Sequence, residues 1–219
     1  MIEISTNSPP AYLHAAPTPV TIPAGKGTVC GDLVLPNGAT GLVLFVRVDG
    51  KYRDYPNDRR VADMFAKYKL ATLLIDLSSA GGQRDVRVLA DLLVHVLRWL
   101  HENPATAHLP LGCFGIDVGA AVALTAAGLP ESPVQAVVAR DGQFEPAAES
   151  LSRITFPILM IAGNDPEGIQ HCKATLEKIK PRSTLNVVPH ATKSFAEPGA
   201  LEDAAQLAAL WFTEHLVPN

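Results

Sequence analysis

The residues with the clearest capacity for chemistry stand in the turn Gly115-Ile116-Asp117-Val118-Gly119. An apolar run precedes this turn, and the small residues 120–123 follow it directly. Glycines at this spacing permit a strained strand-to-helix turn that lifts the middle side chain into a site, the sequence form of a nucleophile elbow. Here the middle side chain is the carboxylate of Asp117, which could act as a nucleophile, as a general acid or base, or as one half of an ion pair.

Alternating apolar runs and helical patterns must position this turn. The apolar runs cover 42–48, 71–77, 111–116, 134–139, 158–162 and 184–188. They contain so few polar residues that both faces must be buried, as in a parallel sheet. Helical patterns are expected at 58–69, 84–101, 119–127, 169–179 and 199–215. The order predicts an α/β fold with a doubly wound, mostly parallel sheet, helices on both faces, and a ligand site at the carboxyl ends of the strands.

One domain over residues 20–219 is expected, because no flexible or charged linker divides the chain of 219 residues. Residues 1–19 are expected to be a poorly ordered lead-in, because their prolines and mixed polar content disfavour regular structure. Two short runs, 20–22 and 29–35, flank a glycine turn and predict an antiparallel hairpin at the edge of the sheet.

The composition of the chain argues against several classes of partner. The net charge of −4 offers no basic surface for nucleic acid, and no apolar run approaches the roughly 20 residues of a membrane span. The chain lacks a basic leader, and its three cysteines form no C-x-x-C pair, which together predict a cytoplasmic protein. No metal site is expected, because the histidines show no ligand spacing. No cofactor is expected either. The long apolar helix stripes could support a homodimer.

Longer stretches resemble the small dienelactone-hydrolase-like branch of the α/β-hydrolases, including members fused to phosphoribosyltransferase domains. The resemblance extends from residue 20 to the C-terminus and depends most on 41–46, 70–77, 111–115, 188–192 and 195–199. It implies an α/β-hydrolase fold without a large cap. It also implies a nucleophile at position 117, a triad acid at Asp165 and a general base at position 193.

This sequence departs from the family pattern at three of these site elements. The elbow serine is replaced by Asp117, and the general-base histidine is replaced by Lys193. The His-Gly step that shapes the oxyanion loop reads Arg47-Val48, with Asp49 next, so only the triad acid Asp165 is retained. A lysine ammonium has no lone pair to accept a proton from a hydroxyl group, and serine-esterase chemistry is therefore excluded.

Two functions fit these departures. The first is a non-hydrolytic protein that binds a small-molecule ligand or a partner, with an Asp117–Lys193 ion pair joined by Asp165 and Arg47. The residues expected to line the binding site are Arg47, Asp49, Val118 and His190. The second is a repurposed hydrolase or lyase in which Asp117 works with Lys193 or His190 in hydrolysis, elimination or cyclisation of a small molecule.

Other noticeable residues are interpreted without a chemical role. Cys113 lies inside an apolar strand and is expected to be a small core residue. Asp76 and the run Arg140-Asp141-Gly142 follow strands; the latter could border the crevice but is interpreted as a simple turn. Tyr52, Arg53 and Tyr55 could narrow the mouth of the pocket.

Overall fold

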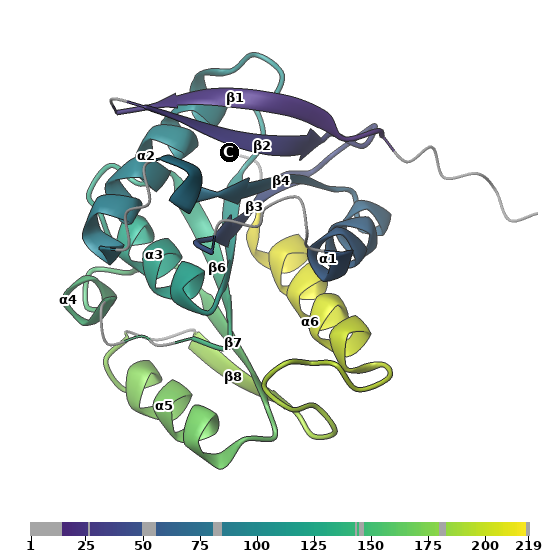
Figure 1. The fold of residues 1–219 in the computed structure, drawn as a ribbon, viewed down its shortest axis with the longest axis vertical. Coiled ribbons are helices and arrows are strands. Elements are labelled where there is room, and N and C mark those ends of the chain that lie inside the picture. The colour runs from purple at the N-terminus through teal and green to yellow at the C-terminus, as the bar shows by residue number, and fades with distance from the viewer. Residues whose placement is uncertain are drawn as a thin grey trace, which may run out of the picture.

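An eight-stranded sheet runs through the middle of the molecule, with helices on both faces (Figure 1). The computed structural model describes residues 15–25, 27–49, 56–80, 85–142, 144, 147–179 and 183–217. The strand order is β1-β2-β4-β3-β5-β6-β7-β8. Every pair from β4 to β8 is parallel, whereas β1 pairs with β2, and β2 with β4, in antiparallel fashion. The doubly wound, mostly parallel sheet and the edge hairpin are therefore confirmed.

The elements agree closely with the sequence pattern. The strands are β1 Thr18–Ala24, β2 Gly27–Val34, β3 Gly41–Arg47, β4 Leu70–Asp76, β5 Leu111–Ile116, β6 Val134–Arg140, β7 Ile158–Gly163 and β8 Ser183–Val188. The helices are α1 Pro56–Lys67, η1 Leu77–Ala80, α2 Val86–Glu102, α3 Val118–Ala127, α4 Ala148–Leu151, α5 Pro166–Leu176 and α6 Ala200–His215. The two short helices η1 and α4 have no counterpart in the predicted pattern, because a single turn shows no periodicity.

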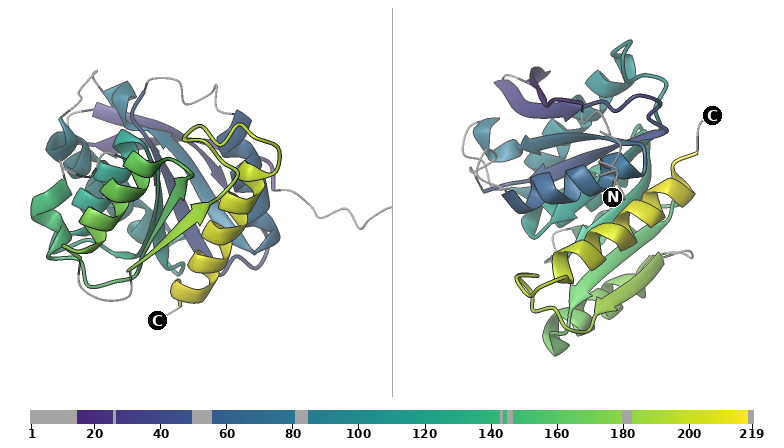
Figure 2. Two further views of the ribbon diagram at one scale, coloured as in Figure 1. Left: turned by 90° about the horizontal axis from the view of Figure 1, so that it is seen from below. Right: turned by 90° about the vertical axis from the view of Figure 1, so that its right-hand side faces the viewer.

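Two hydrophobic layers enclose the sheet. Helices α2, α3 and α5 lie on one face, and α1 and α6 lie on the other (Figures 1 and 2). All residues of β4 and β5 are buried, as expected for strands covered on both sides. On the α1 and α6 face, four aromatic rings pack with centroids 5.0–5.8 Å apart. These rings belong to Phe45, Phe65, Phe114 and Phe212.

The N-terminal boundary differs from the prediction by two residues. Thr18 and Pro19 pair with Leu33 and Asp32 in the β1–β2 hairpin, so the ordered domain includes them. Residues 1–14 of the predicted lead-in lie outside the described residues, as do Tyr52, Arg53 and Tyr55. No helix within the described ranges has the length and apolarity that a bilayer-spanning segment requires.

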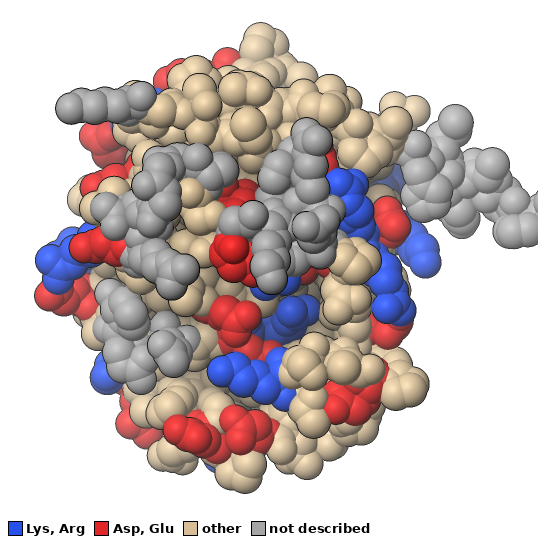
Figure 3. All heavy atoms as spheres, viewed as in Figure 1, with Lys and Arg blue, Asp and Glu red and all other residues tan. Residues whose placement is uncertain are grey.

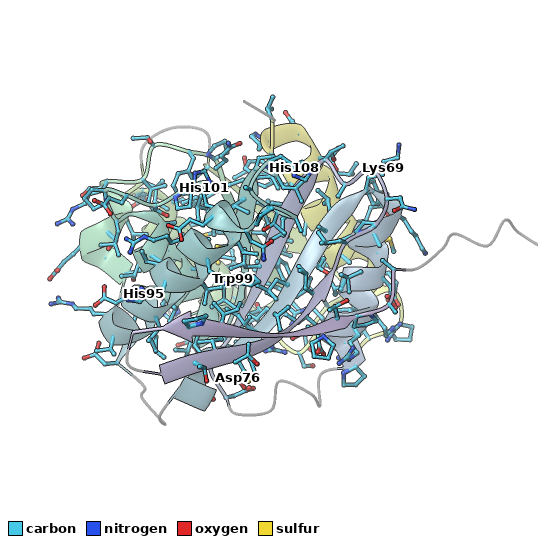
Figure 4. All side chains as sticks on the ribbon, turned by 90° about the horizontal axis from the view of Figure 1, so that it is seen from above. Lys69, Asp76, His95, Trp99, His101 and His108 are labelled. Atoms are coloured by element: carbon cyan, nitrogen blue, oxygen red, sulfur yellow. The ribbon has the colours of Figure 1, made fainter. Side chains whose placement is uncertain are left out.

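The two ends of β4 mark opposite edges of the sheet. Lys69 precedes this strand and Asp76 ends it, and Figure 4 shows them on opposite sides of the molecule. The exposed His101 and His108 lie toward the Lys69 edge in that view. They are therefore remote from the carboxyl ends of the strands, where a ligand site is expected.

Candidate functional site

The elbow presents Asp117 to solvent at the carboxyl end of β5. Asp117 has a φ of 52°, in the left-handed region that side-chain-bearing residues rarely adopt. Its backbone N–H donates to the carbonyl oxygen of Asp141 at 2.7 Å, which ties the turn to the end of the neighbouring strand β6. The side chain of Asp117 is 60% exposed. The turn thus has the shape that lifts a reactive group out of the sheet.

Both glycines of the elbow are required by close packing. A Cβ atom at Gly115 would lie 2.5 Å from the Cα atom of Ala120. A Cβ atom at Gly119 would lie 2.0 Å from the carbonyl oxygen of Val46. Because the obstructing atoms belong to the backbone, neither position can accept a side chain unless helix α3 moves away from the strands.

Arg47 links the elbow to helix α1. Its Nε and Nη2 atoms donate to the two carboxylate oxygens of Asp58 at 2.7 and 3.2 Å. Its Nη1 atom lies 4.0 Å from Oδ2 of Asp117. Asp58 is buried and Arg47 nearly so, and two-point contacts of this kind hold a guanidinium in a fixed orientation. Arg47 therefore brings a fixed positive charge to the elbow carboxylate.

The predicted ion pair between Asp117 and Lys193 is wrong. Lys193 is exposed in the turn after β8, and within the described part of the chain no salt bridge joins it to Asp117 or Asp165. An exposed lysine gains little from pairing because its ammonium stays hydrated, whereas Arg47 is held in place by Asp58. Arg47 is thus the cation beside Asp117, and Lys193 acts only at longer range, where its charge lowers the pKa of Asp141.

Asp165 and His190 each have a local partner away from the elbow. Oδ2 of Asp165 accepts from the backbone N–H of Gly168 at 2.9 Å and so caps the N-terminus of α5. Nε2 of His190 lies 3.6 Å from Oδ2 of Asp203 on α6, and both side chains are about half exposed. The structure therefore does not bring either residue into contact with Asp117.

The remaining predicted residues border the elbow or its strand. Val118 is the first residue of α3 and is exposed beside Asp117. Asp49 is exposed two residues after the end of β3. Cys113 is fully buried in β5, and burial raises the pKa of its thiol to about 12, which confirms it as a core residue.

The interpretation of Arg140 as part of a simple turn is wrong. Arg140 ends β6 and is only 7% exposed. Its guanidinium carbon lies 5.2 Å from the centroid of the Phe195 ring, a cation–π contact. The buried Nε and Nη1 atoms have no hydrogen-bond acceptor among the residues that the structure describes. Burial lowers the pKa of Arg140, and the nearby carboxylates of Asp58, Asp141 and Asp117 partly oppose that shift.

Asp141 is the second residue whose environment the sequence did not predict. It follows Arg140 and has a positive φ of 41°. Burial raises the pKa of its carboxyl group to about 7, with Arg140 lowering it and Asp117 raising it. One sequence signal could have found both residues: Arg140 ends β6 and Asp141 follows it, and β6 lies next to the elbow strand in a parallel sheet.

Acidic and basic side chains gather near the middle of the face that Figure 3 shows, which is also the face of Figure 1. The contacts above define a charged site made of Arg47, Asp58, Asp117, Arg140 and Asp141, with Lys193 at longer range. The arrangement can bind polar groups, and it contains no described imidazole positioned to activate water.

Three comparisons with known proteins bear on the family of this chain. No family model matches the sequence. Two Mycobacterium tuberculosis proteins that bear the name "Putative phosphoribosyl transferase" are 38% identical to it over 204 residues. The match covers 90% of this chain and 46% of those proteins, so the chain spans about half the length of these relatives.

Solved structures resemble the whole chain. The esterase domain of a Rhodothermus marinus protein matches with a TM-score of 0.74 at 14% identity, covering 91% of this chain and 99% of that one, and so shows the fold alone. A dienelactone hydrolase from Anabaena variabilis matches with a TM-score of 0.85 at 38% identity, covering 92% of this chain and 99% of that one. With this identity over nearly the full length of both chains, the protein belongs to the dienelactone hydrolase family of the α/β-hydrolase fold.

Proposed function

We propose that this chain is a non-hydrolytic member of its family that binds a small polar molecule at the carboxyl ends of its strands. The approach of Arg47 to Asp117, 4.0 Å between Nη1 and Oδ2, carries the proposal. A hydrolase of this fold needs a nucleophile and a base that can take up a proton. Here the elbow side chain is a carboxyl group beside a guanidinium, which carries hydrogen-bond donors but no acceptor.

The surrounding residues support the same conclusion. If Asp117 attacked a substrate carbon, the resulting ester would need an activated water for its release. His190 lies beside Asp203, and the exposed Lys193 pairs with neither Asp117 nor Asp165 in the part of the chain that the structure describes. No described residue therefore takes the role that the family's histidine fills. The charged side chains that remain are suited to binding polar groups of a ligand.

One observation favours a second candidate, a repurposed hydrolase or lyase. Burial raises the pKa of Asp141 to about 7, and this carboxyl group interacts with Asp117. A carboxyl group that titrates near the working pH is suited to general acid–base catalysis. In this candidate Asp117 is the nucleophile or base, and Asp141 delivers or removes the proton.

Turnover assays separate the two candidates. The full chain and its Asp117→Asn variant are incubated with aryl esters, lactones, haloalkanes and epoxides, and the products are measured by chromatography. The proposal predicts no turnover above background for either protein. Asp63→Asn, an exposed change on α1, serves as the matched control. Turnover that persists in Asp63→Asn and disappears in Asp117→Asn would overturn the proposal in favour of the enzyme.

Mass spectrometry tests the covalent version of the second candidate directly. After incubation with haloalkane and epoxide probes, peptides that contain Asp117 are searched for an added alkyl group. The binding proposal predicts unmodified peptides. A modified Asp117 in the wild-type chain, absent from Asp117→Asn, would establish it as a nucleophile.

A further inference from the structure

Arg140 is a buried cation, and two of its three guanidinium nitrogens, Nε and Nη1, lack a hydrogen-bond partner among the described residues. Its side chain is enclosed at the end of β6, and neither Nε nor Nη1 has an acceptor within the described ranges. A guanidinium carries five N–H donors, and buried donors are almost always paired. The other guanidinium of the site is engaged, because Arg47 uses two of its nitrogens on Asp58. The unpaired donors on Nε and Nη1 of Arg140 are therefore the strongest candidates in this site for binding a ligand.

The surroundings hold this guanidinium in one place. The ring of Phe195, buried in the loop between β8 and α6, lies under it at 5.2 Å. Within the described residues, four non-glycine residues have positive φ, and three of them, Asp117, Asp141 and Phe195, belong to this site. Strained backbone of this kind persists where the surrounding structure enforces it, often at ligand sites.

A second positive element lies beside the same site. Helix α3, ten residues long, begins at Val118 immediately after the elbow. Asp117 occupies its N-cap position but makes no side-chain hydrogen bond to the first turn. The unpaired N–H groups of a helix N-terminus attract anions. The oxygen atoms of one bound anion could thus interact with both the helix end and Arg140.

We propose that Arg140 is the anchor for an oxyanion, a carboxylate or phosphate group of a small organic ligand, at the charged site beside Asp117. This inference rests on the proposed function and names the class of ligand. An oxyanion supplies the acceptors that Nε and Nη1 lack, and a guanidinium matches its planar or tetrahedral oxygens well. The carboxylates of Asp117 and Asp141 oppose anion binding, so the ligand is held most tightly when Asp141 is neutral.

The charges around Asp141 determine how the proposed anion binding depends on pH. Among the described residues, those that act on its carboxyl group are Arg140, Asp117 and Lys193, with the backbone of Gly163 as hydrogen-bond donor. Cys172 of α5 also lies within its influence, since Asp141 raises the pKa of that thiol. Because burial raises the pKa of Asp141 to about 7, anion binding is expected to take up a proton and to weaken above that pH.

Calorimetric titration of the full chain tests the anchor. The probes are benzoate, phenyl phosphate and the neutral benzamide, so that carboxylate, phosphate and uncharged ligands are compared on one ring. We expect saturable binding of at least one anionic probe, none of benzamide, and at least a tenfold loss of affinity in Arg140→Gln. Arg98→Gln, an exposed arginine on α2, should leave affinity unchanged. An affinity for the anions that Arg140→Gln does not change, or no saturable binding of either anion, would overturn the anchor.

A second variant keeps the test decisive if Arg140→Gln does not fold. Asp141→Asn removes a negative charge beside the guanidinium, so at pH 8 it should tighten anion binding severalfold and abolish the pH dependence. Unchanged affinity in Asp141→Asn would contradict the proposed site. The binding titrations and the turnover assays can fail independently. Asp117-dependent turnover would overturn the non-hydrolytic function, whereas the anchor is judged only by whether anion affinity depends on Arg140.

Discussion

Arg47 at the end of β3 binds both carboxylate oxygens of Asp58 on α1, at 2.7 and 3.2 Å, and extends its third nitrogen to within 4.0 Å of Asp117. One side chain thus joins a buried acid to the exposed elbow acid. The contact connects helix α1, strand β3 and the elbow, three segments that are separate in the sequence.

Removal of the buried acid should destabilise the protein strongly. Asp58→Ala leaves the mostly buried Arg47 without its two-point partner, and breaking such a pair costs about 3 kcal/mol. The free energy of unfolding, measured by urea titration, should fall by that amount. Glu131→Ala removes the exposed partner of Arg98 and should cost less than about 0.5 kcal/mol. Equal losses in the two variants would show that the Arg47–Asp58 contact is not a buried pair.

Asp141 should make the fold less stable as pH rises. Its carboxyl pKa is raised from 3.8 to about 7, so between these values the folded chain keeps a proton that the unfolded chain has lost. Stability from this group is complete below pH 3.8 and is lost as pH rises through 7. Because Asp141 is partly accessible to solvent, the expected effect is only about 1–2 kcal/mol.

Asn at position 141 isolates this contribution. Asp141→Asn should be more stable than the wild type by about 1–2 kcal/mol at pH 8 and nearly equal to it at pH 4, as measured by urea titration at both values. Asp63→Asn is the control for a general charge effect, since Asp63 is exposed on α1. A stability difference for Asp141→Asn that is the same at both pH values would rule out the raised pKa.

The elbow should not tolerate a methyl group at Gly119. A Cβ atom there would meet the Val46 carbonyl oxygen at 2.0 Å, and this backbone atom belongs to the central strand β3. Gly119→Ala should therefore lose about 3 kcal/mol of unfolding free energy or fail to fold. Gly27→Ala is the comparison, because its Cβ would meet only the carbonyl oxygen of Ala24, at 4.0 Å. If the two variants melt at the same temperature, the elbow is less tightly packed than the structure indicates.

Placing serine at position 117 and histidine at position 193, as the family resemblance suggests for an active enzyme, should not create an esterase. In the double variant Asp117→Ser with Lys193→His, Arg47 still occupies the position that shapes the family's oxyanion loop. We expect p-nitrophenyl acetate hydrolysis within about tenfold of the Asp117→Asn background, because loss of oxyanion stabilisation alone costs about 10²–10³ in rate. Circular dichroism should show the double variant to be folded. A burst of p-nitrophenol would instead show that the oxyanion loop is intact.

Local sequence determined the fold and the position of the elbow. Apolar runs such as 111–116 leave a chain no alternative to burial on both faces, and the strands begin and end within about two residues of those runs. The elbow could also be predicted from the sequence, because backbone packing within a few residues of the turn requires the flanking glycines. The resemblance to the family pattern had also pointed to positions 47, 117 and 193 as elements of the site.

Tertiary structure alone decided how the charges of the site pair. The sequence offered Lys193 as the partner of Asp117, but the choice depends on which cation is held rigidly, and Asp58 on α1 holds Arg47. Likewise, nothing near Arg140 in the sequence shows that its guanidinium is enclosed over the ring of Phe195. Burial and pairing of a charge depend on segments brought together by the fold, because solvation and Coulomb energies are set by distance in space and not by distance along the chain.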